Sequence, residues 1–153
     1  MSDAEAGSGP RLVLFDFDGA LTTVETVPLF VRAAAPAWRV RFGGLLLAPL
    51  VLAYRAGVVS GATVRAAIVR LAFSGMPRDA FEAKAGAFAA ERFPALLRPA
   101  MVARLRAHRE AGDQVIVVSG NFEALLRPWC AAEGVDLLAS ALECREDRLT
   151  GRY

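Results

Sequence analysis

The chain of 153 residues has very little cysteine, histidine or lysine, and each shortage excludes a class of site. Its two cysteines, Cys130 and Cys144, stand outside any Cys-x-x-Cys or Cys/His spacing, so we expect reduced thiols and no zinc site. The single histidine, His108, lies close to two arginines, which predicts a solvated helix face and leaves no Ser-His-Asp set. Lys84 is the only lysine, so arginine carries nearly all of the positive charge.

Positive and negative charges are nearly balanced, with a formal net charge of +2. The arginines are scattered without interleaved aromatic residues, so we expect no nucleic-acid partner. Hydrophobic residues make up 55% and charged residues 22%, which excludes a disordered or collagen-like chain and fits one domain, with or without an insertion. Residues 1–10, MSDAEAGSGP, are polar and glycine-rich, which predicts a flexible tail, no signal peptide and a cytoplasmic protein.

The most informative stretch is RLVLFDFDGALTT, residues 11–23. Residues 12–15 form an uninterrupted apolar run, typical of a buried strand in a parallel sheet. Asp16 and Asp18 follow at its carboxyl end, and Gly19 breaks the extended run. Because ligands bind at the carboxyl ends of strands in open α/β sheets, the two acids are candidate functional residues.

The middle of the chain, residues 38–98, is rich in alanine, leucine and arginine, with apolar residues spaced by three and four. This pattern predicts helices, and six proline and glycine breakers predict that they are short pieces of a small bundle. These breakers are Pro49, Gly57, Gly61, Gly75, Pro77 and Pro94. The uncharged segment of residues 42–54, FGGLLLAPLVLAY, is too short to span a membrane. It is expected to be a buried bundle helix or, alternatively, a hydrophobic surface that touches lipid or an apolar substrate.

The α/β pattern returns near Pro99. The expected elements are a helix over residues 100–111, a buried strand over 114–118, a helix over 122–133, an extended segment over 137–144 and a hairpin that turns at Glu146 and Asp147. Between the second strand and its helix stand Ser119, Gly120 and Asn121. A hydroxyl and an N–H group at a helix N-terminus can hold phosphoryl oxygens.

Two acids at a strand end can support phosphoryl transfer. One carboxylate can attack phosphorus and form an aspartyl-phosphate, while the second protonates the leaving oxygen and then activates water. The negative charge that gathers there favours Mg²⁺. Alternatives are an Asx turn or a calcium loop, although Ala20 and Val27 stand where an EF-hand needs oxygen ligands. Plain helix capping would likewise explain VVSGN.

The segment VLFDFDGALT, followed about a hundred residues later by VIVVSGNFE, resembles the first two motifs of the haloacid dehalogenase-like (HAD) superfamily, in its phosphoserine-phosphatase-like branch. The resemblance implies an α/β fold: a Rossmann-like parallel core, residues 1–27 and 97–153, with an inserted helical cap, residues 28–96. It implies a Mg²⁺-dependent phosphatase acting on a small phosphorylated metabolite. By resemblance, Asp16 is the nucleophile and a metal ligand, and Asp18 is the general acid/base and binds the metal through its carbonyl. Ser119 and Gly120 bind phosphate, while Glu25 and Arg65 contact the rest of the substrate.

The sequence also departs from this family. Ala20 replaces a usual threonine, and neither the lysine of the third motif nor the G-D-x-x-x-D motif follows. We therefore expect a C-terminally truncated member with two of four motifs and an incomplete sheet, whose apolar edge lies at residues 12–15. A homodimer or a companion chain would complete it. The alternative function is a catalytically incomplete fragment that binds a partner or a membrane surface.

Overall fold

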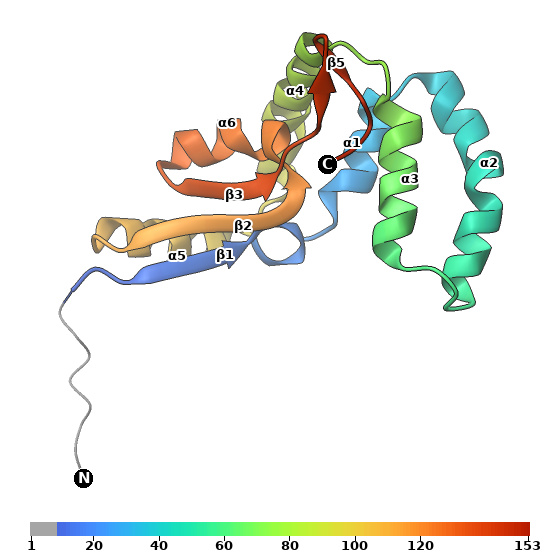
Figure 1. Cartoon of the computed structure of the whole chain (residues 1–153). Helices are drawn as coiled ribbons and strands as arrows, with labels where there is room; N and C mark the ends of the chain where they lie inside the picture. The colour runs from blue at the N-terminus through green and yellow to red at the C-terminus, as the bar shows by residue number, and fades with distance from the viewer. Residues whose placement is uncertain (1–8) are drawn as a thin grey trace.

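A three-stranded parallel sheet lies on one side of the structure, a computed structural model that describes residues 9–153 (Figure 1). Its strands are β1 (Leu12–Asp16), β2 (Gln114–Phe122) and β3 (Asp136–Ser140), in the order β1-β2-β3. Leu12 pairs with Gln114 and Asp16 with Val118. The α/β class and the parallel strand at residues 12–15 are confirmed, whereas most of the predicted tail, residues 1–8, lies outside the described residues.

Helices α5 (Pro99–Glu110) and α6 (Glu123–Glu133) cover one face of this sheet. Right-handed crossovers between successive parallel strands place both helices on the same side. Phe15, Val115 and Val117 are buried beneath them. On the opposite face, Leu12, Leu14 and Leu138 are 60–64% exposed, so within the described residues no element covers this side. The predicted incomplete sheet is thereby confirmed, and the exposed apolar surface includes a face as well as the β1 edge.

Four helices form the insertion that separates β1 from α5 and β2. They are α1 (Thr26–Ala34), α2 (Ala37–Arg55), α3 (Gly61–Phe73) and α4 (Arg78–Leu96). The breaks predicted at Gly57 and at Gly75 are confirmed, but those predicted at Pro49 and Pro94 are wrong, because both prolines lie inside continuous helices. A proline removes one hydrogen bond from the ladder and strains the preceding turn, and a helix of 19 residues retains enough other turns to continue.

Aromatic side chains join the insertion to the sheet. Phe30 of α1, Phe73 of α3 and Phe81 of α4 pack against one another and against Phe122 at the end of β2, with ring centroids 5.0–6.2 Å apart. Most of these contacts are edge-to-face, and all four rings are buried. Helix α4 also packs along α6, so the helical insertion shares its hydrophobic core with the α/β part.

The two connections between the sheet and the insertion run side by side. Thr22 and Leu97 form an isolated antiparallel bridge. The Thr23 N–H donates to the Leu96 carbonyl at 2.9 Å, and the Arg98 N–H donates to the Leu21 carbonyl at 2.8 Å. The chain therefore enters and leaves the insertion at one place, next to the carboxyl end of β1.

Helix α2 is the exception to this packing. Gly43 is its only buried residue, and Phe42, Leu45, Leu46 and Leu52 are 62–79% exposed. The expectation of a buried bundle helix over residues 42–54 is therefore wrong, because α2 contacts α3 and α1 along one side only. Among the described residues, α2 is also the one helix that is long and apolar enough to cross a membrane, with 19 residues and a mean hydropathy of 1.2.

The end of the chain forms the predicted hairpin. Strands β4 (Cys144–Arg145) and β5 (Arg148–Leu149) are antiparallel, and the turn residues Glu146 and Asp147 have φ values of 49° and 57°. Two left-handed residues are typical of a two-residue hairpin turn. The preceding strand is shorter than expected, because β3 ends at Ser140 and the chain then bends towards α4.

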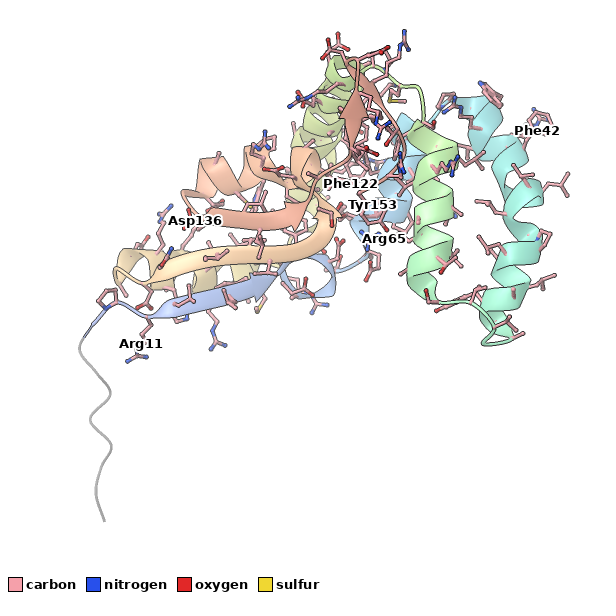
Figure 2. The ribbon with its side chains drawn as sticks, in the orientation of Figure 1. Arg11, Phe42, Arg65, Phe122, Asp136 and Tyr153 are labelled. Atoms are coloured by element: carbon pink, nitrogen blue, oxygen red, sulfur yellow. The ribbon has the colours of Figure 1, made fainter. Side chains whose placement is uncertain are left out.

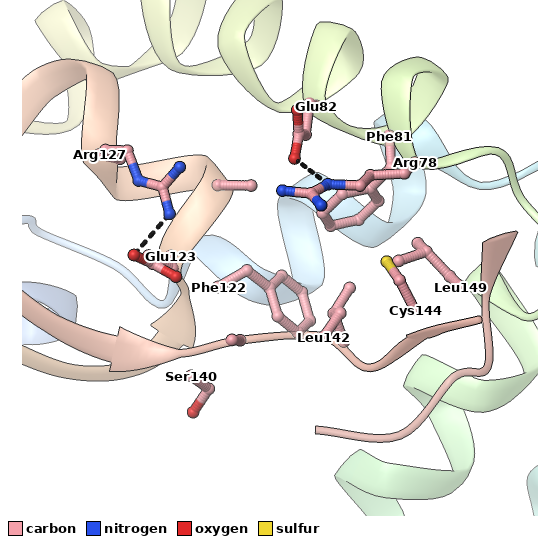
Figure 3. Close-up of a pocket in the computed structure, with 12 residues that line it drawn as sticks. Arg78, Phe81, Glu82, Phe122, Glu123, Arg127, Ser140, Leu142, Cys144 and Leu149 are labelled. Carbon is pink, nitrogen blue, oxygen red and sulfur yellow. Dashed lines mark hydrogen bonds and ion pairs between the residues drawn. The ribbon is translucent and has the colours of Figure 1, made fainter. Parts of the chain in front are cut away.

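A small cavity of about 150 Å³ lies where this bend meets α4 and α6 (Figure 3). Its walls carry two ion pairs, Arg78 with Glu82 and Arg127 with Glu123. None of the site residues predicted from the sequence lines it, so we interpret it as imperfect packing beneath the hairpin.

Candidate active site

Asp16 is the last residue of β1, and its side chain is exposed at the carboxyl end of the sheet. Its Oδ1 accepts a hydrogen bond from the Phe17 N–H at 2.8 Å. The chain then makes a tight turn over Phe17–Leu21, which is closed by the Thr22 N–H donating to the Phe17 carbonyl at 2.9 Å. Gly19 has a φ of 79° in this turn, a value that favours glycine. The turn leaves Asp16 at the strand end and redirects Asp18.

Asp18 is half-buried and held by two elements that are distant in sequence. Its Oδ1 accepts from the N–H of Thr26 at 3.1 Å and from the hydroxyl of Thr26 at 2.7 Å. Its Oδ2 accepts from Nδ2 of Asn121 at 3.1 Å. Thr26 is the first residue of α1, so the carboxylate also lies at the positive end of a helix dipole. Asp18 is therefore oriented by α1 and by the end of β2.

Asn121 is a site residue that the sequence did not reveal. It is 1% exposed, and its Nδ2 also donates to Oγ1 of Thr26 at 2.6 Å. Its Oδ1 accepts from the N–H of Phe122 at 2.7 Å. The available signal was an amide residue just past a buried strand, on the sheet edge where Asp18 was also expected. Asn121 connects Asp18, α1 and β2 in one hydrogen-bond network.

Ser119 lies one residue beyond Val118, the partner of Asp16, at the point where the register of β2 with β3 shifts, so Asp16 and Ser119 lie on neighbouring strands near the carboxyl end of the sheet. The Ser119 Oγ accepts from the N–H of Asn121 at 3.1 Å. The helix expected over residues 122–133 is confirmed as α6, but the strand expected to end at Val118 continues to Phe122 with an irregular register. Ser119 and Gly120 therefore lie in an extended segment, three to four residues before the helix begins. Hydrogen bonding between β2 and β3 and the hydrogen bonds of Asn121 keep this segment extended.

Arg65 and Glu25 approach this end of the sheet from the helical insertion. Nη2 of Arg65, on α3, donates to the carbonyl of Gly120 at 2.7 Å. Its guanidinium carbon lies 6.0 Å from the centre of the Tyr153 ring, and Figure 2 shows Arg65 and Tyr153 together beside Phe122. Glu25 precedes α1, is exposed and makes no side-chain cap. Glu25 and Arg65 line the same groove, described below.

The oxygen atoms near Asp16 suit a hard cation that retains water. Mg²⁺ is commonly held by one or two protein oxygens plus water and phosphate. Asp16 offers an exposed carboxylate, whereas both side-chain oxygens of Asp18 accept hydrogen bonds, which leaves its carbonyl as the available donor. Within residues 9–153, no group of three or more His, Cys, Asp or Glu side chains could hold a metal ion. The fit is thus to a partly hydrated Mg²⁺.

A family model described as haloacid dehalogenase-like hydrolase matches residues 13–153, which include every site residue above. The chain belongs to the haloacid dehalogenase-like hydrolases. Protein CicA from Caulobacter vibrioides (strain NA1000 / CB15N) is similar to it, with 37% identity over 145 residues, covering 94% of this chain and 64% of CicA. The chain therefore spans less than two thirds of the length of that relative.

Solved structures with a similar fold were also found. A protein of unknown function from Bordetella pertussis Tohama I has a TM-score of 0.68 and 26% identity, over 94% of this chain and 66% of its own. A phosphoserine phosphatase solved as a phospho-aspartyl intermediate analogue has a TM-score of 0.56 and 22% identity, over 93% of this chain and 61% of its own. The chain therefore shares its fold with phosphoserine phosphatases.

Proposed function

We propose that this protein is a Mg²⁺-dependent phosphatase that hydrolyses a small phosphomonoester through an aspartyl-phosphate on Asp16. The observation that supports this most is the position of Asp16: an exposed carboxylate at the end of β1, next in register to Ser119 on the neighbouring strand. Family membership and the phosphatases of the same fold also support hydrolysis of a phosphate ester. The substrate as a small metabolite and the cytoplasmic location stay predictions.

In the first step, a carboxylate oxygen of Asp16 attacks phosphorus while the bond from phosphorus to the alcohol oxygen breaks. Asp18 gives its proton to the departing oxygen. In the second step, Asp18 takes a proton from a water that attacks phosphorus, which releases phosphate and regenerates the Asp16 carboxylate. Hydrogen bonds from Thr26 and Asn121 fix the orientation in which Asp18 exchanges this proton.

Three further groups surround the reacting phosphate in this proposal. The hydroxyl of Ser119 and the N–H of Gly120 bind its oxygens, next to the guanidinium of Arg65. Mg²⁺, held by Asp16 and the Asp18 carbonyl, would offset negative charge on the phosphate. Glu25 and Arg65 contact the alcohol part of the substrate.

The test is release of phosphate from p-nitrophenyl phosphate with Mg²⁺ present. Asp16→Asn keeps the shape of the side chain but removes the nucleophile, so we expect at least about a 10²-fold loss of rate. Asp136→Asn is the matched control, because Asp136 is an exposed acid at the opposite end of the sheet, where it contacts Gln114. Equal activity of Asp16→Asn and the unmodified chain, or no hydrolysis by the unmodified chain, would contradict the proposal.

A further inference from the structure

A large groove lies between α1, α2 and α3, with a volume of about 650 Å³. This volume falls within the range of roughly 300–1,000 Å³ that is typical of small-molecule sites. Its lining is mostly aliphatic, and α2 contributes Val40, Leu47 and Val51 from one face. Gly43 and Gly44 flatten the helix at the middle of that face. A ligand in this groove would meet mainly hydrocarbon.

One end of the groove is polar and adjoins the candidate active site. Glu25 and Arg65 line that end. Arg65 contacts the carbonyl of Gly120, and Glu25 immediately precedes Thr26, which binds Asp18. Tyr54 and Gly61 lie beside this end, because Gly61 is one helical turn before Arg65 and close to the Tyr54 ring. The aliphatic remainder extends from there along α2 and α3 to Val40 and Ala72. The groove thus leads from a phosphate site into an aliphatic channel.

The charge of the surrounding helices favours an anionic ligand. Residues 26–77 contain six arginines and no aspartate or glutamate, although the whole chain has a net charge of only +2. The charged residues that line the groove are Glu25, Arg32, Arg39 and Arg65. Positive potential of this kind attracts phosphorylated molecules.

We propose that the substrate is an amphiphilic phosphomonoester, with its phosphate at Asp16 and its alkyl chain in the groove between α1, α2 and α3. The position of the phosphate rests on the proposed function, whereas the alkyl site rests on the groove alone. Burial of a methylene group tightens binding about fourfold when burial is complete. In a groove open on one side we expect about two- to fourfold per methylene.

The probes are monobutyl, monohexyl, monooctyl and monododecyl phosphate, each below its micelle-forming concentration, with binding to the full chain measured by calorimetry. The affinity should rise at each step of chain length. Gly44→Phe should remove this rise, because a Cβ at Gly44 meets nothing within 4 Å and the ring enters the groove. Phenylalanine also has a better helix propensity than glycine, so α2 should remain folded.

The matched control is Gly86→Phe. Gly86 is a glycine inside α4, outside the groove, and a Cβ there likewise meets nothing within 4 Å. This variant should keep the chain-length dependence. An affinity that does not change with chain length, or an equal loss in both variants, would overturn the alkyl site. Chain-length-dependent binding without Asp16-dependent hydrolysis would instead refute the proposed function and leave the alkyl site standing.

The outer side of α2 supports a second proposal independently of the groove. Phe42, Leu45, Leu46 and Leu52 form a contiguous exposed apolar face, here called the outer face of α2, and Figure 2 shows Phe42 directed away from the protein. Arg41 lies near one end of this helix and Arg55 closes the other. We propose that the outer face of α2 docks on an anionic lipid bilayer surface.

Charge and packing favour a helix that lies on the bilayer over one that spans it. An apolar face flanked by arginines is typical of interfacial helices. If α2 spanned the bilayer, α3, which packs along it, would carry Arg65 and Arg70 into the hydrocarbon. Six arginines without acids in residues 26–77 complement anionic headgroups.

The test is co-flotation of the full chain with vesicles of phosphatidylcholine alone or with 30% phosphatidylglycerol. We expect binding to the anionic vesicles that weakens with salt and falls at least about tenfold in the double variant Leu45→Gln/Leu46→Gln. Leu12→Gln/Leu14→Gln is the control, since these residues are similarly exposed on the sheet. Absence of binding by the unmodified chain, or equal losses in both variants, would refute the lipid surface.

Discussion

Asn121→Asp is the sharpest probe of the hydrogen-bond network at the candidate site. The substitution changes an N–H₂ group, 3.1 Å from Oδ2 of Asp18 and 2.6 Å from the Thr26 hydroxyl, into a carboxylate oxygen. Position 121 is 1% exposed, so the new charge cannot turn to solvent. Two carboxylates would then face each other where a donor and an acceptor faced before.

The magnitude follows from the distance. Two unit charges about 3.1 Å apart interact by about 5 kcal/mol at an effective dielectric constant of 20. The folded protein avoids part of this repulsion by binding one proton, so the pair has one pKa raised above its ordinary value. At pH values between the pKa of these carboxyl groups in the unfolded chain and the raised pKa in the folded protein, only the folded state holds the extra proton. The free energy of unfolding therefore falls by about 1.4 kcal/mol for each unit of rising pH. We expect Asn121→Asp to be about 3–5 kcal/mol less stable than the unmodified chain at pH 8, and much closer to it at pH 5.

Urea unfolding followed by tryptophan fluorescence at pH 5, 6, 7 and 8 measures this difference. The double variant Asp18→Asn/Asn121→Asp is the control, because it exchanges the charged and neutral partners and leaves one carboxylate. It should recover most of the stability lost at pH 8. A difference between Asn121→Asp and the unmodified chain that stays constant from pH 5 to 8 would show that the Asn121 amide does not face Asp18.

Three other predictions concern packing outside the site. Burial raises the pKa of the Cys130 thiol to about 12, so only Cys144 should react quickly with a thiol reagent at pH 8. This single fast reaction should be lost in Cys144→Ser, and Cys130 should react only in urea. Glu133 accepts a bidentate hydrogen bond from Arg106, which lowers the pKa of the Glu133 carboxyl group. This ion pair therefore stabilises the fold above the ordinary pKa of glutamate, and the stabilisation is lost as the pH falls through the pKa of the folded state. In urea unfolding, Glu133→Gln should cost about 1–2 kcal/mol at pH 7 and less below about pH 4. Gly151→Ala should cost about 1–3 kcal/mol more than Gly112→Ala in thermal unfolding, because both glycines have φ near 80° but only at Gly151 does the new Cβ meet a backbone atom, Cα of Arg70 at 2.7 Å. A second fast thiol, a Glu133→Gln effect independent of pH, or equal costs at the two glycines would contradict the respective prediction.

Local patterns accounted for much of the sheet and its ends. The run at residues 12–15 and the run QVIVV were apolar enough to be read as buried parallel strands, and the structure pairs them. The Glu146-Asp147 turn was visible because two charged residues separate two short extended segments, and aspartate tolerates the left-handed conformation that the turn needs. The pattern predicts Asp16 and Ser119 at the carboxyl ends of two strands; the register brings them to neighbouring positions, although β2 continues three residues beyond Ser119.

The errors came from contacts that are distant in sequence. Pro94 reads as a breaker because local rules ignore the packing of α4 along α6. Helix α2 continues through Pro49 with little packing, because its 19 residues keep enough other turns. The hydropathy of residues 42–54 suggested burial, since a sequence does not show whether other helices surround a given helix. The sequence does not reveal the role of Asn121, because this role depends on hydrogen bonds to Asp18 and Thr26, about a hundred residues earlier in the chain.

The long insertion between β1 and β2 also determines the order in which the fold can assemble. Leu12 pairs with Gln114, so β1 emerges from a ribosome roughly 100 residues before the strand that it pairs with. At about 5–20 residues per second, β1 waits on the order of 5–20 seconds for β2. Contacts between α2 and α3 join residues close in sequence and form with a smaller loop-closure cost. The helices are therefore expected to fold first during synthesis, while the strand that carries Asp16 remains exposed to chaperones until β2 arrives.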